Sequence, residues 1–389
     1  MTQRPERFDA AVVGGGLSGL AAASVLSGAG LHTLHVAPAG PPDRRTSALM
    51  MPSVDFLTAS GLIDSPQSIG TPLRRIRIID ATPRLIRAPE TLFDSAEAGL
   101  DAFAWNFPNT ALSESFREAA ASNDRLVTVE ASLKSLESFE DGYLVRLDDG
   151  SAASVRLVVG ADGKRSTVRE AAAIGVREHK FQQSALVCDV ELERGLEGTS
   201  VEFHYRKGPF TLVPAGNNRA NLVWIDDHAQ LETARASGPQ GLTALLNARS
   251  QHLFGAVSLA SPSFVFPLAT LAAHEAGRDG IALVGESLHA FPPLGAQGLN
   301  LGLRDVADLA ASVADLDVSA PGWAKAAVGE YSTRRRSDLV RTGTLVDTLY
   351  RSLLSDFLPA QALRAGGLWA LKSMPSLRRQ AFGVGMGRR

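Results

Sequence analysis

The sequence predicts an α/β protein in which a parallel sheet carries an inserted, mainly antiparallel second sheet. Three observations predict this fold. The chain opens with an apolar stretch, a glycine-rich turn, an alanine-rich helix pattern and a second apolar stretch. Two later apolar stretches also run directly into turns that contain glycine and an acid. Between these two lies a long segment of short strand patterns separated by turn residues, which is typical of an antiparallel sheet.

Length and composition fit two domains and exclude several function classes. The 389 residues exceed what one hydrophobic core usually supports. The net charge of −2 argues against nucleic acid as the main partner. The single cysteine permits no internal disulfide, and the eight histidines lack metal-ligand spacing, so we expect no metal. No apolar run has the length of a signal peptide or of a membrane-spanning helix, which predicts a cytoplasmic protein.

The N-terminal segment predicts a strand, a helix and a second strand in succession. Residues 8–13 are apolar, residues 17–30 are alanine-rich and end in glycine, and residues 31–37 are again mostly apolar. The first turn fits G-x-G-x-x-G with Gly14, Gly16 and Gly19. Such glycines form a tight turn, let the backbone approach a pyrophosphate and let the helix pack closely on the strand. Because a helix N-terminus attracts phosphate, this unit predicts a dinucleotide site.

One residue departs from the dinucleotide pattern. Ala37 ends the second strand, where an acidic side chain normally binds the adenosine ribose. A charged hydrogen bond of that kind contributes roughly 1.5–3 kcal/mol, against about 12 kcal/mol for nanomolar binding. Its absence weakens such a site without abolishing it.

The elements that follow are predicted from periodicity and turn residues. A basic loop leads into a helix near residue 50, and a hairpin joins residues 73–80 to residues 84–87. A helix covers residues 110–121. Three strand-like segments follow, at residues 125–130, 143–151 and 155–163.

The last of these strands runs into the polar turn GADGKRSTVRE. Asp162 and Gly163 follow buried residues, and a basic helix begins near Ser166. Two interpretations stay open. An ordinary strand-to-helix turn explains the pattern, and so does a groove for phosphate and ribose lined by Asp162, Gly163, Ser166 and Arg169.

Residues 177–270 are strand-rich and are predicted to form the inserted antiparallel sheet. In one strand Cys188 alternates with acids, so we expect its thiol in the core. The chain ends differently, since no acid follows Asp356 and six basic residues are interleaved with apolar ones. This ending suits contact with anionic lipid, and equally a packed helix with a solvated face.

The stretch GESLHAFPPLGAQGLNLGLRD, from Gly285 to Asp305, concentrates features that a structural loop does not need. Each interior helix glycine, here Gly298 and Gly302, costs about 1 kcal/mol relative to alanine, and each of two adjacent prolines removes a backbone donor. A flat ring lying against this backbone explains them. The amides at the start of the helix then face an edge whose negative charge grows on reduction. The stretch therefore predicts a flavin site.

The segments GGGLSG, GADGKRSTVR and GESLHAFPPLGAQGLNLGLRD, in this order, resemble the three motifs of the class A FAD-dependent aromatic monooxygenases. Within that class the sequence is most similar to the ubiquinone-biosynthesis hydroxylases, through FQQSALVCDVE, GAQGLNLGLRD and YSTRRRSDLV. The resemblance covers nearly the whole chain. It implies a Rossmann-like FAD-binding domain, an inserted substrate domain as in para-hydroxybenzoate hydroxylase, and a helical C-terminal tail.

The resemblance also implies domain boundaries. The FAD-binding domain is discontinuous and takes residues 1–73, 100–176 and 271–330. The substrate domain takes residues 74–99 and 177–270, and the C-terminal helical region takes residues 331–389.

Carried over residue by residue, the resemblance assigns roles toward FAD. The three glycines of the first motif hold the pyrophosphate, Arg45 and Asn109 line the cleft, and Asp162 serves both FAD and the approach of the nicotinamide. The ribityl chain and flavin ring are surrounded by Gly285, Glu286, Pro293, Gly295, Gln297, Gly298 and Asn300. Three residues depart from the family pattern: Ala37, Glu286 where Asp is usual, and Thr110 where Arg is common.

His289 and Pro293 are the residues of the third motif that we expect nearest to the chemistry. His289 either assists the proton of the phenol or fixes the loop through a backbone bond. Apolar residues of the inserted sheet are expected to cover the substrate ring. The candidates are Phe203, Phe210, Leu212 and Trp224, although core packing explains them equally well.

The function implied by the resemblance is hydroxylation of a polyprenylated phenol in ubiquinone biosynthesis. NADH or NADPH reduces FAD, dioxygen forms a flavin hydroperoxide, and its distal oxygen is transferred to the ring. The implied location is the cytoplasm, with peripheral contact at the inner membrane face and with other quinone-biosynthesis proteins. Two alternatives stay open: the same chemistry on a small soluble aromatic or polyketide, and a non-catalytic flavin-fold subunit of a biosynthetic complex.

Overall fold

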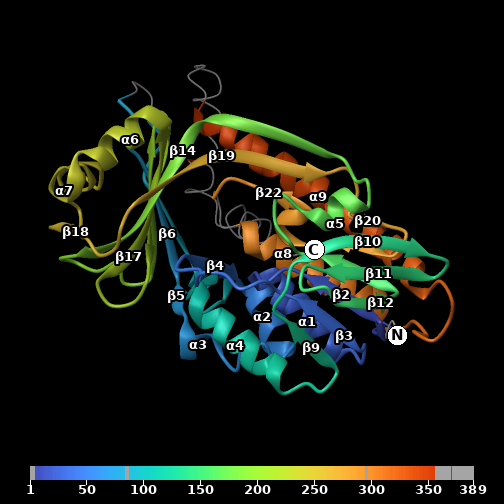
Figure 1. Cartoon of the computed structure of the whole chain (residues 1–389). Helices are drawn as coiled ribbons and strands as arrows, with labels where there is room; N and C mark the ends of the chain where they lie inside the picture. Colours follow the sequence, from blue (N-terminus) through green and yellow to red (C-terminus); the bar gives the residue numbers. More distant parts are fainter. Residues whose placement is uncertain (1–4, 84–86, 294–296, 355–368, 370–389) are drawn as a thin grey trace.

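A mostly parallel six-stranded sheet forms the centre of one half of the molecule (Figure 1). The computed structural model describes residues 5–83, 87–293, 297–354 and 369. The strand order is β20 (Gly277–Arg278), β21 (Ile281–Leu283), β13 (Leu157–Gly160), β2 (Ala10–Val13), β3 (Thr33–Val36) and β9 (Leu126–Val129). All pairs are parallel except β20 with β21. Every residue of β2, β3, β13 and β21 is buried, as expected for a parallel sheet covered on both faces.

Helices and a smaller sheet cover these strands. Helix α1 contacts α4 and α8, and α8 in turn contacts α9. A four-stranded sheet adds Val145 and Val155 to the same core. These elements are α1 (Leu17–Gly28), α4 (Asn109–Ala121), α8 (Gln297–Val313), α9 (Trp323–Leu354), β1 (Glu6–Arg7), β10 (Leu133–Phe139), β11 (Gly142–Leu147) and β12 (Ala152–Val155).

The second half is a nine-stranded sheet with α6 (His228–Ala236) and α7 (Gly238–Arg249) packed on one face (Figure 1). Its pairs are antiparallel except β15 with β6. The order is β22 (His289–Ala290), β19 (Phe264–Ala273), β14 (Val176–Leu192), β17 (Arg219–Asp227), β16 (Gly208–Pro214), β15 (Thr199–Tyr205), β6 (Arg75–Asp80) and β7 (Thr91–Asp94), with β18 (Val257–Leu259) beside β14.

A three-stranded sheet lies between the two halves. It consists of β4 (Thr46–Met50), β8 (Ala104–Pro108) and β5 (Thr71–Leu73), and α2 (Met51–Ala59) follows β4 directly. Leu73 and Ala104 of this sheet belong to an apolar cluster against which Val213 of β16 also packs. The small sheet therefore connects the parallel sheet to the antiparallel one.

The predicted α/β fold with an inserted antiparallel sheet is confirmed. Strand β6 pairs with β7 at residues 91–94, and residues 84–86 of the hairpin partner that we expected lie outside the described part. The basic loop before α2 ends in a strand, β4. Helix α9 passes through residue 331, the start of the expected C-terminal helical region. Of the basic, apolar C-terminal ending, only Trp369 is described beyond residue 354.

Cys188 lies in the core, as its alternation with acids predicts. Its side chain is on β14 among buried neighbours Val190 and Leu192. Burial, with a further contribution from the charge of Asp189, raises the pKa of the thiol to about 12. The thiol is therefore an inert core group. Among the described residues, no helix is long and apolar enough to cross a bilayer.

Candidate functional site

The three motif turns leave neighbouring strands at the same edge of the parallel sheet. β21, β13 and β2 lie side by side and run in the same direction, so their carboxyl ends meet. Gly14 follows β2, Ala161 and Asp162 follow β13, and Gly285 follows β21. Ligands of open α/β sheets bind at this edge, where the chain connections diverge to opposite sides.

Gly14 brings the first and second motifs into contact. Its φ of +131° is a conformation that favours glycine, and a Cβ there would collide with the Ala161 carbonyl. A Cβ at Gly19 would likewise collide with the Gly14 carbonyl. Two of the three predicted glycines are thus required by close packing.

The third glycine of the motif faces open space. Gly16 is exposed, and a Cβ built on it meets no heavy atom within 4 Å. It is the N-cap of α1, and in the described residues no side chain caps this helix. The first-turn amides of α1 therefore lack a side-chain acceptor. This arrangement fits a bound pyrophosphate, whose charge is favoured at a helix N-terminus.

Ser18, which the sequence interpretation did not single out, connects α1 to the third motif. A Cβ at Gly285 would lie 2.8 Å from Ser18 Oγ, and a Cβ at Gly302 would lie 2.6 Å from the same atom. Gly302 therefore serves the packing of α8 on α1. Gly298 is different, because it is exposed and a Cβ there meets nothing within 4 Å. The sequence predicts that glycines at the start of this helix leave space for a ligand. Of Gly298 and Gly302, only Gly298 does so.

The Asp162 side chain holds the start of α5 (Thr167–Ala171). Its carboxylate accepts from Ser166 Oγ at 2.5 Å and from the Val168 amide at 3.1 Å. Arg169, which is buried, donates to the Ser287 carbonyl at 2.8 Å and so links this turn to the third motif. The local-turn interpretation thus accounts for the contacts of the carboxylate. The backbone of Asp162 still lies against Gly14.

Arg45 and Asn109 come together around an acid that sequence reasoning missed. Arg45 donates twice to Asp43, from Nε to Oδ1 and from Nη2 to Oδ2, each at 2.8 Å. Asn109 Nδ2 donates to Asp43 Oδ2 at 2.8 Å, and its Oδ1 accepts from Ser47 Oγ at 2.7 Å. Burial alone would raise the pKa of Asp43, but hydrogen bonds from Arg45 and Asn109 and the Arg45 charge lower it to about 2.

Glu286 lies within electrostatic reach of Arg45. The hydrogen bond to Asp43 is the main cause that raises the pKa of Arg45, and the charge of Glu286 adds to it. The Glu286 side chain is exposed, and Arg45 exposes 69% of its side chain. Arg45 and Glu286 of the third motif thus place a basic and an acidic side chain at one surface, beside Asn109.

Asn300 is tied to the small sheet. Its Oδ1 accepts from the Met50 amide at 2.8 Å and from Ser53 Oγ at 2.7 Å, and its Nδ2 donates to the Ala48 carbonyl at 2.8 Å. Pro293 and Gln297 flank residues 294–296, so Gly295 lies outside the described part. Pro293 is exposed and Gln297 is half-buried.

His289 is buried, and its bond differs from the backbone bond that we considered. Its Nε2 lies 2.7 Å from Asp305 Oδ2, and the side chain exposes only 1% of its area. Phe291 stacks on the ring with centroids 6.0 Å apart. A proton donor or acceptor must reach the substrate, so this burial disfavours proton transfer by His289.

The four candidates for covering the substrate ring lie in the core beneath α6 and α7, as the core-packing interpretation predicts. Phe203, Phe210, Leu212 and Trp224 form a core with Leu231 of α6 and Leu242 and Leu246 of α7. Side chains alternate along a strand, so their neighbours Thr211, Val213, Asn221 and Val223 point to the other face. Asn221 Oδ1 accepts from Thr46 of β4 at 2.9 Å and from Asn106 of β8 at 2.7 Å. This second face is therefore the one turned toward the motif turns.

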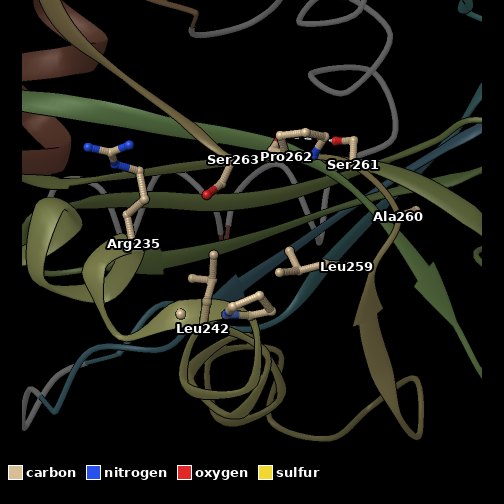
Figure 2. A pocket seen from close by; sticks show the side chains of 9 residues that line it. Arg235, Leu242, Leu259, Ala260, Ser261, Pro262 and Ser263 are labelled. Atoms are coloured by element: carbon tan, nitrogen blue, oxygen red, sulfur yellow. Dashed lines mark hydrogen bonds between the residues drawn. The ribbon is translucent and has the colours of Figure 1, made fainter.

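A surface hollow of about 410 Å³ lies away from these turns, between α7 and the segment that follows β18. Figure 2 shows Arg235, Leu242 and Pro262 among its lining residues. None of its lining residues belongs to the three motifs. Because Arg235 belongs to α6 and Leu242 to α7, the hollow lies on the helix-covered side of the large sheet and is separate from the site described above.

Comparisons with known proteins find an FAD-binding domain and related hydroxylases. A family described as an FAD binding domain matches residues 7–341. The chain is 32% identical to the ubiquinone hydroxylase UbiL of Rhodospirillum rubrum, over 97% of this chain and 89% of that protein. It is 29% identical to the 3-demethoxyubiquinol 3-hydroxylase of Escherichia coli, over 100% of both chains.

The fold is also that of a solved hydroxylating enzyme. The structure of p-nitrophenol 4-monooxygenase PnpA from Pseudomonas putida DLL-E4 superposes with a TM-score of 0.81 at 19% identity, covering 99% of this chain and 100% of that one. At that identity the likeness shows the fold alone. The match over residues 7–341 and the similarity to UbiL show the family. The chain belongs to the FAD-dependent aromatic monooxygenases that include the ubiquinone hydroxylases.

Proposed function

We propose that this protein hydroxylates the aromatic ring of a polyprenylated phenol intermediate of ubiquinone biosynthesis, with FAD, NADH or NADPH, and dioxygen. The observation that carries the proposal is the meeting of the three motif turns at one edge of the parallel sheet. The similarity to two quinone-pathway hydroxylases over nearly the whole chain supports the choice of substrate class.

The residues at this edge have distinct roles in the proposal. Gly14, Gly16 and Gly19 with the N-terminus of α1 hold the pyrophosphate of FAD. Arg45, oriented by Asp43 and Asn109, lines the cleft, and Glu286 accepts from a ribityl hydroxyl. The exposed residues Pro293 and Gly298 border the flavin ring, with Gln297 beside them. FAD supplies the oxidation chemistry when bound, and the chain supplies orientation and exclusion of water.

Asp162 and Asn300, the remaining predicted residues, support this site through side-chain bonds to neighbouring elements. The Asp162 backbone lies at the glycine turn while its carboxylate holds α5. Asn300 fixes β4 against α8. In the proposal its contact with flavin is made by backbone atoms, because its side chain is bonded to β4 and α2.

The substrate ring lies between the flavin and the second face of the large sheet. Thr211, Val213 and Val223 stand on that face, and Asn221 ties it to the small sheet. A mixed apolar and weakly polar surface suits a phenol ring that carries an apolar chain. Contact with the inner membrane face and with other quinone-biosynthesis proteins belongs to the proposal as well, since a polyprenylated substrate resides in lipid.

The test is complementation of an Escherichia coli strain that lacks its 3-demethoxyubiquinol 3-hydroxylase, with quinone intermediates identified by mass spectrometry. We expect the accumulated intermediate to disappear when this chain is expressed. If it persists, strains that lack the other ring hydroxylases are tested next. Accumulation unchanged in all of them would contradict the proposed substrate class.

Purified protein separates the alternatives. A catalytic enzyme is yellow and forms hydroxylated product as it oxidises NAD(P)H, whereas a non-catalytic subunit forms none. Hydroxylation of small soluble phenols but not of a short-chain prenylated phenol would favour a soluble substrate. Flotation with anionic liposomes tests the membrane contact independently.

A further inference from the structure

A buried ion cluster lies beneath the turn that carries Glu286. Asp305 of α8 and Arg335 of α9 are each 0% exposed, and Asp338 is 3% exposed. Charged side chains are almost never fully buried unless they are paired. We therefore expect the cluster to hold a particular part of the fold in place.

Asp305 holds the turn at both ends. Its Oδ2 accepts from the Gly285 amide at 2.9 Å and from His289 Nε2 at 2.7 Å. One oxygen atom thus fixes the two ends of the segment 285–289, and the exposed Glu286 lies between them. Gly285 has a φ of +62°, so the turn keeps a conformation that favours glycine.

Arg335 of helix α9 forms an ion pair with the other oxygen of Asp305. Its Nε lies 2.7 Å from Asp305 Oδ1, and its Nη1 contacts Asp308 Oδ2 at 2.8 Å and Asp338 Oδ2 at 2.7 Å. Burial acts to lower the pKa of Arg335, but the charge of Asp305 and the hydrogen bond to Asp308 outweigh burial and raise it. The guanidinium therefore stays charged.

Helix α9 also holds the strand that leads into the turn. Tyr331, one helical turn before Arg335, donates to the Leu283 carbonyl at 2.6 Å. Burial, with the charge of Asp305, raises the pKa of Tyr331 well above its ordinary value, so the phenol remains a donor. Two consecutive turns of α9 therefore fix the end of β21 and the loop after it.

We propose that Arg335 and Asp305 are positioning residues of the FAD site. The ion pair holds the 285–289 turn so that Glu286 faces the ribityl chain. Neither residue touches FAD itself. The inference rests on the proposed assignment of Glu286 to FAD.

The test compares Arg335→Met with the matched variant Arg249→Met. Arg249 also forms a largely buried ion pair, with Asp226 Oδ2 at 2.7 Å, but it is the last residue of α7 and stacks on Tyr205 and Trp224 of the large sheet. Apoprotein of each variant is titrated with FAD by flavin fluorescence, and its thermal unfolding is measured without FAD. A third readout is the hydrogen peroxide released per NAD(P)H oxidised.

We expect both variants to unfold at a lower temperature and only Arg335→Met to bind FAD about tenfold more weakly. The visible flavin spectrum and the peroxide yield change only in Arg335→Met. A folded Arg335→Met protein with the wild-type dissociation constant for FAD and the wild-type spectrum would overturn the proposal. So would an equal loss of FAD affinity in Arg249→Met.

Asp305→Asn covers the case in which Arg335→Met does not fold. The amide keeps the shape and an acceptor for Gly285, but removes the charge that holds Arg335. We expect the same weaker FAD binding, and an unchanged dissociation constant would again contradict the proposal. Failure of the proposed function looks different, because wild-type protein would bind FAD and form no hydroxylated product.

Discussion

At the scale of single residues, the departures from the family pattern carry the sharpest expectations. Ala37 directly follows β3 and lies beside the glycine turn, since a Cβ on Gly15 would lie 3.3 Å from the Ala37 Cβ. The position that lacks the usual acid is therefore next to the turn that we propose to hold the pyrophosphate. An acidic side chain introduced there has a route to the adenosine ribose.

We expect Ala37→Glu to bind FAD more tightly than wild type. A charged hydrogen bond to a ribose hydroxyl contributes roughly 1.5–3 kcal/mol, which corresponds to a dissociation constant about tenfold lower or better. Titration of apoprotein with FAD measures the change. Ala29→Glu, at the exposed end of α1, adds the same charge as a control. Equal affinity of Ala37→Glu and Ala29→Glu would contradict the placement of the ribose at β3.

Asp43 gives a pH-dependent contribution to stability. Its folded-state pKa of about 2 lies below the ordinary value of 3.8, because Arg45 and Asn109 stabilise the carboxylate. The contribution is therefore complete above about pH 4 and is lost as the pH falls toward about 2. Urea unfolding of wild type and Asp43→Asn should show a constant difference in free energy from about pH 4 to 7 and a smaller one below. A difference that grows on acidification would show that the pKa shift has the opposite sign.

At the scale of elements, the two early glycines of α8 separate packing from ligand access. Gly302 faces Ser18, and Gly298 faces open space. We expect Gly302→Ala to destabilise the protein by about 1–3 kcal/mol through overpacking. Ser18→Ala should restore most of that loss, because it removes the Oγ that the new methyl group would meet. Urea unfolding of both single variants and the double variant measures the coupling.

Gly298→Ala is expected to act in the opposite way. Alanine in an open helical position stabilises the fold by up to about 1 kcal/mol. The added methyl group would narrow the space proposed for the flavin ring, so FAD should bind more weakly to a more stable protein. Unaltered FAD affinity in Gly298→Ala would argue against a ring at this position.

The sequence predicted the parts of the fold that local pattern determines. Apolar runs ending in glycine turns identified β2, β13 and β21, and their shared direction placed the motif turns together. It did not predict β7 as the partner of β6, because strand pairing depends on tertiary contacts. Nor did it predict α6 and α7. Alternation along β16 and β17 assigns their side chains to two faces of the sheet, but it does not show which face these helices cover. The cluster of Asp305 and Arg335 joins two helices and escaped prediction for the same reason.

At the scale of the whole molecule, the site depends on how the large sheet is placed over the parallel one. Asn221 bonds to Thr46 and Asn106 of the small sheet and donates to Asp189 Oδ1 at 2.6 Å. These bonds orient one face of β17 toward the motif turns. The opposite face is committed to the core beneath α6 and α7. Substitutions at neighbouring residues of β17 should therefore have different effects, on stability at one residue and on substrate binding at the next.

Leu222 and Val223 test this difference with two substitutions one residue apart. Leu222 is buried beneath α6 and α7, so Leu222→Ala should cost about 2–5 kcal/mol of stability and leave the KM of the phenol unchanged. Val223 is half-buried on the second face, so Val223→Trp should raise the KM and the peroxide released per NAD(P)H. Steady-state kinetics of the folded variants and urea unfolding give both quantities. A higher KM in Leu222→Ala with wild-type kinetics in Val223→Trp would mean that the substrate lies on the α6–α7 side.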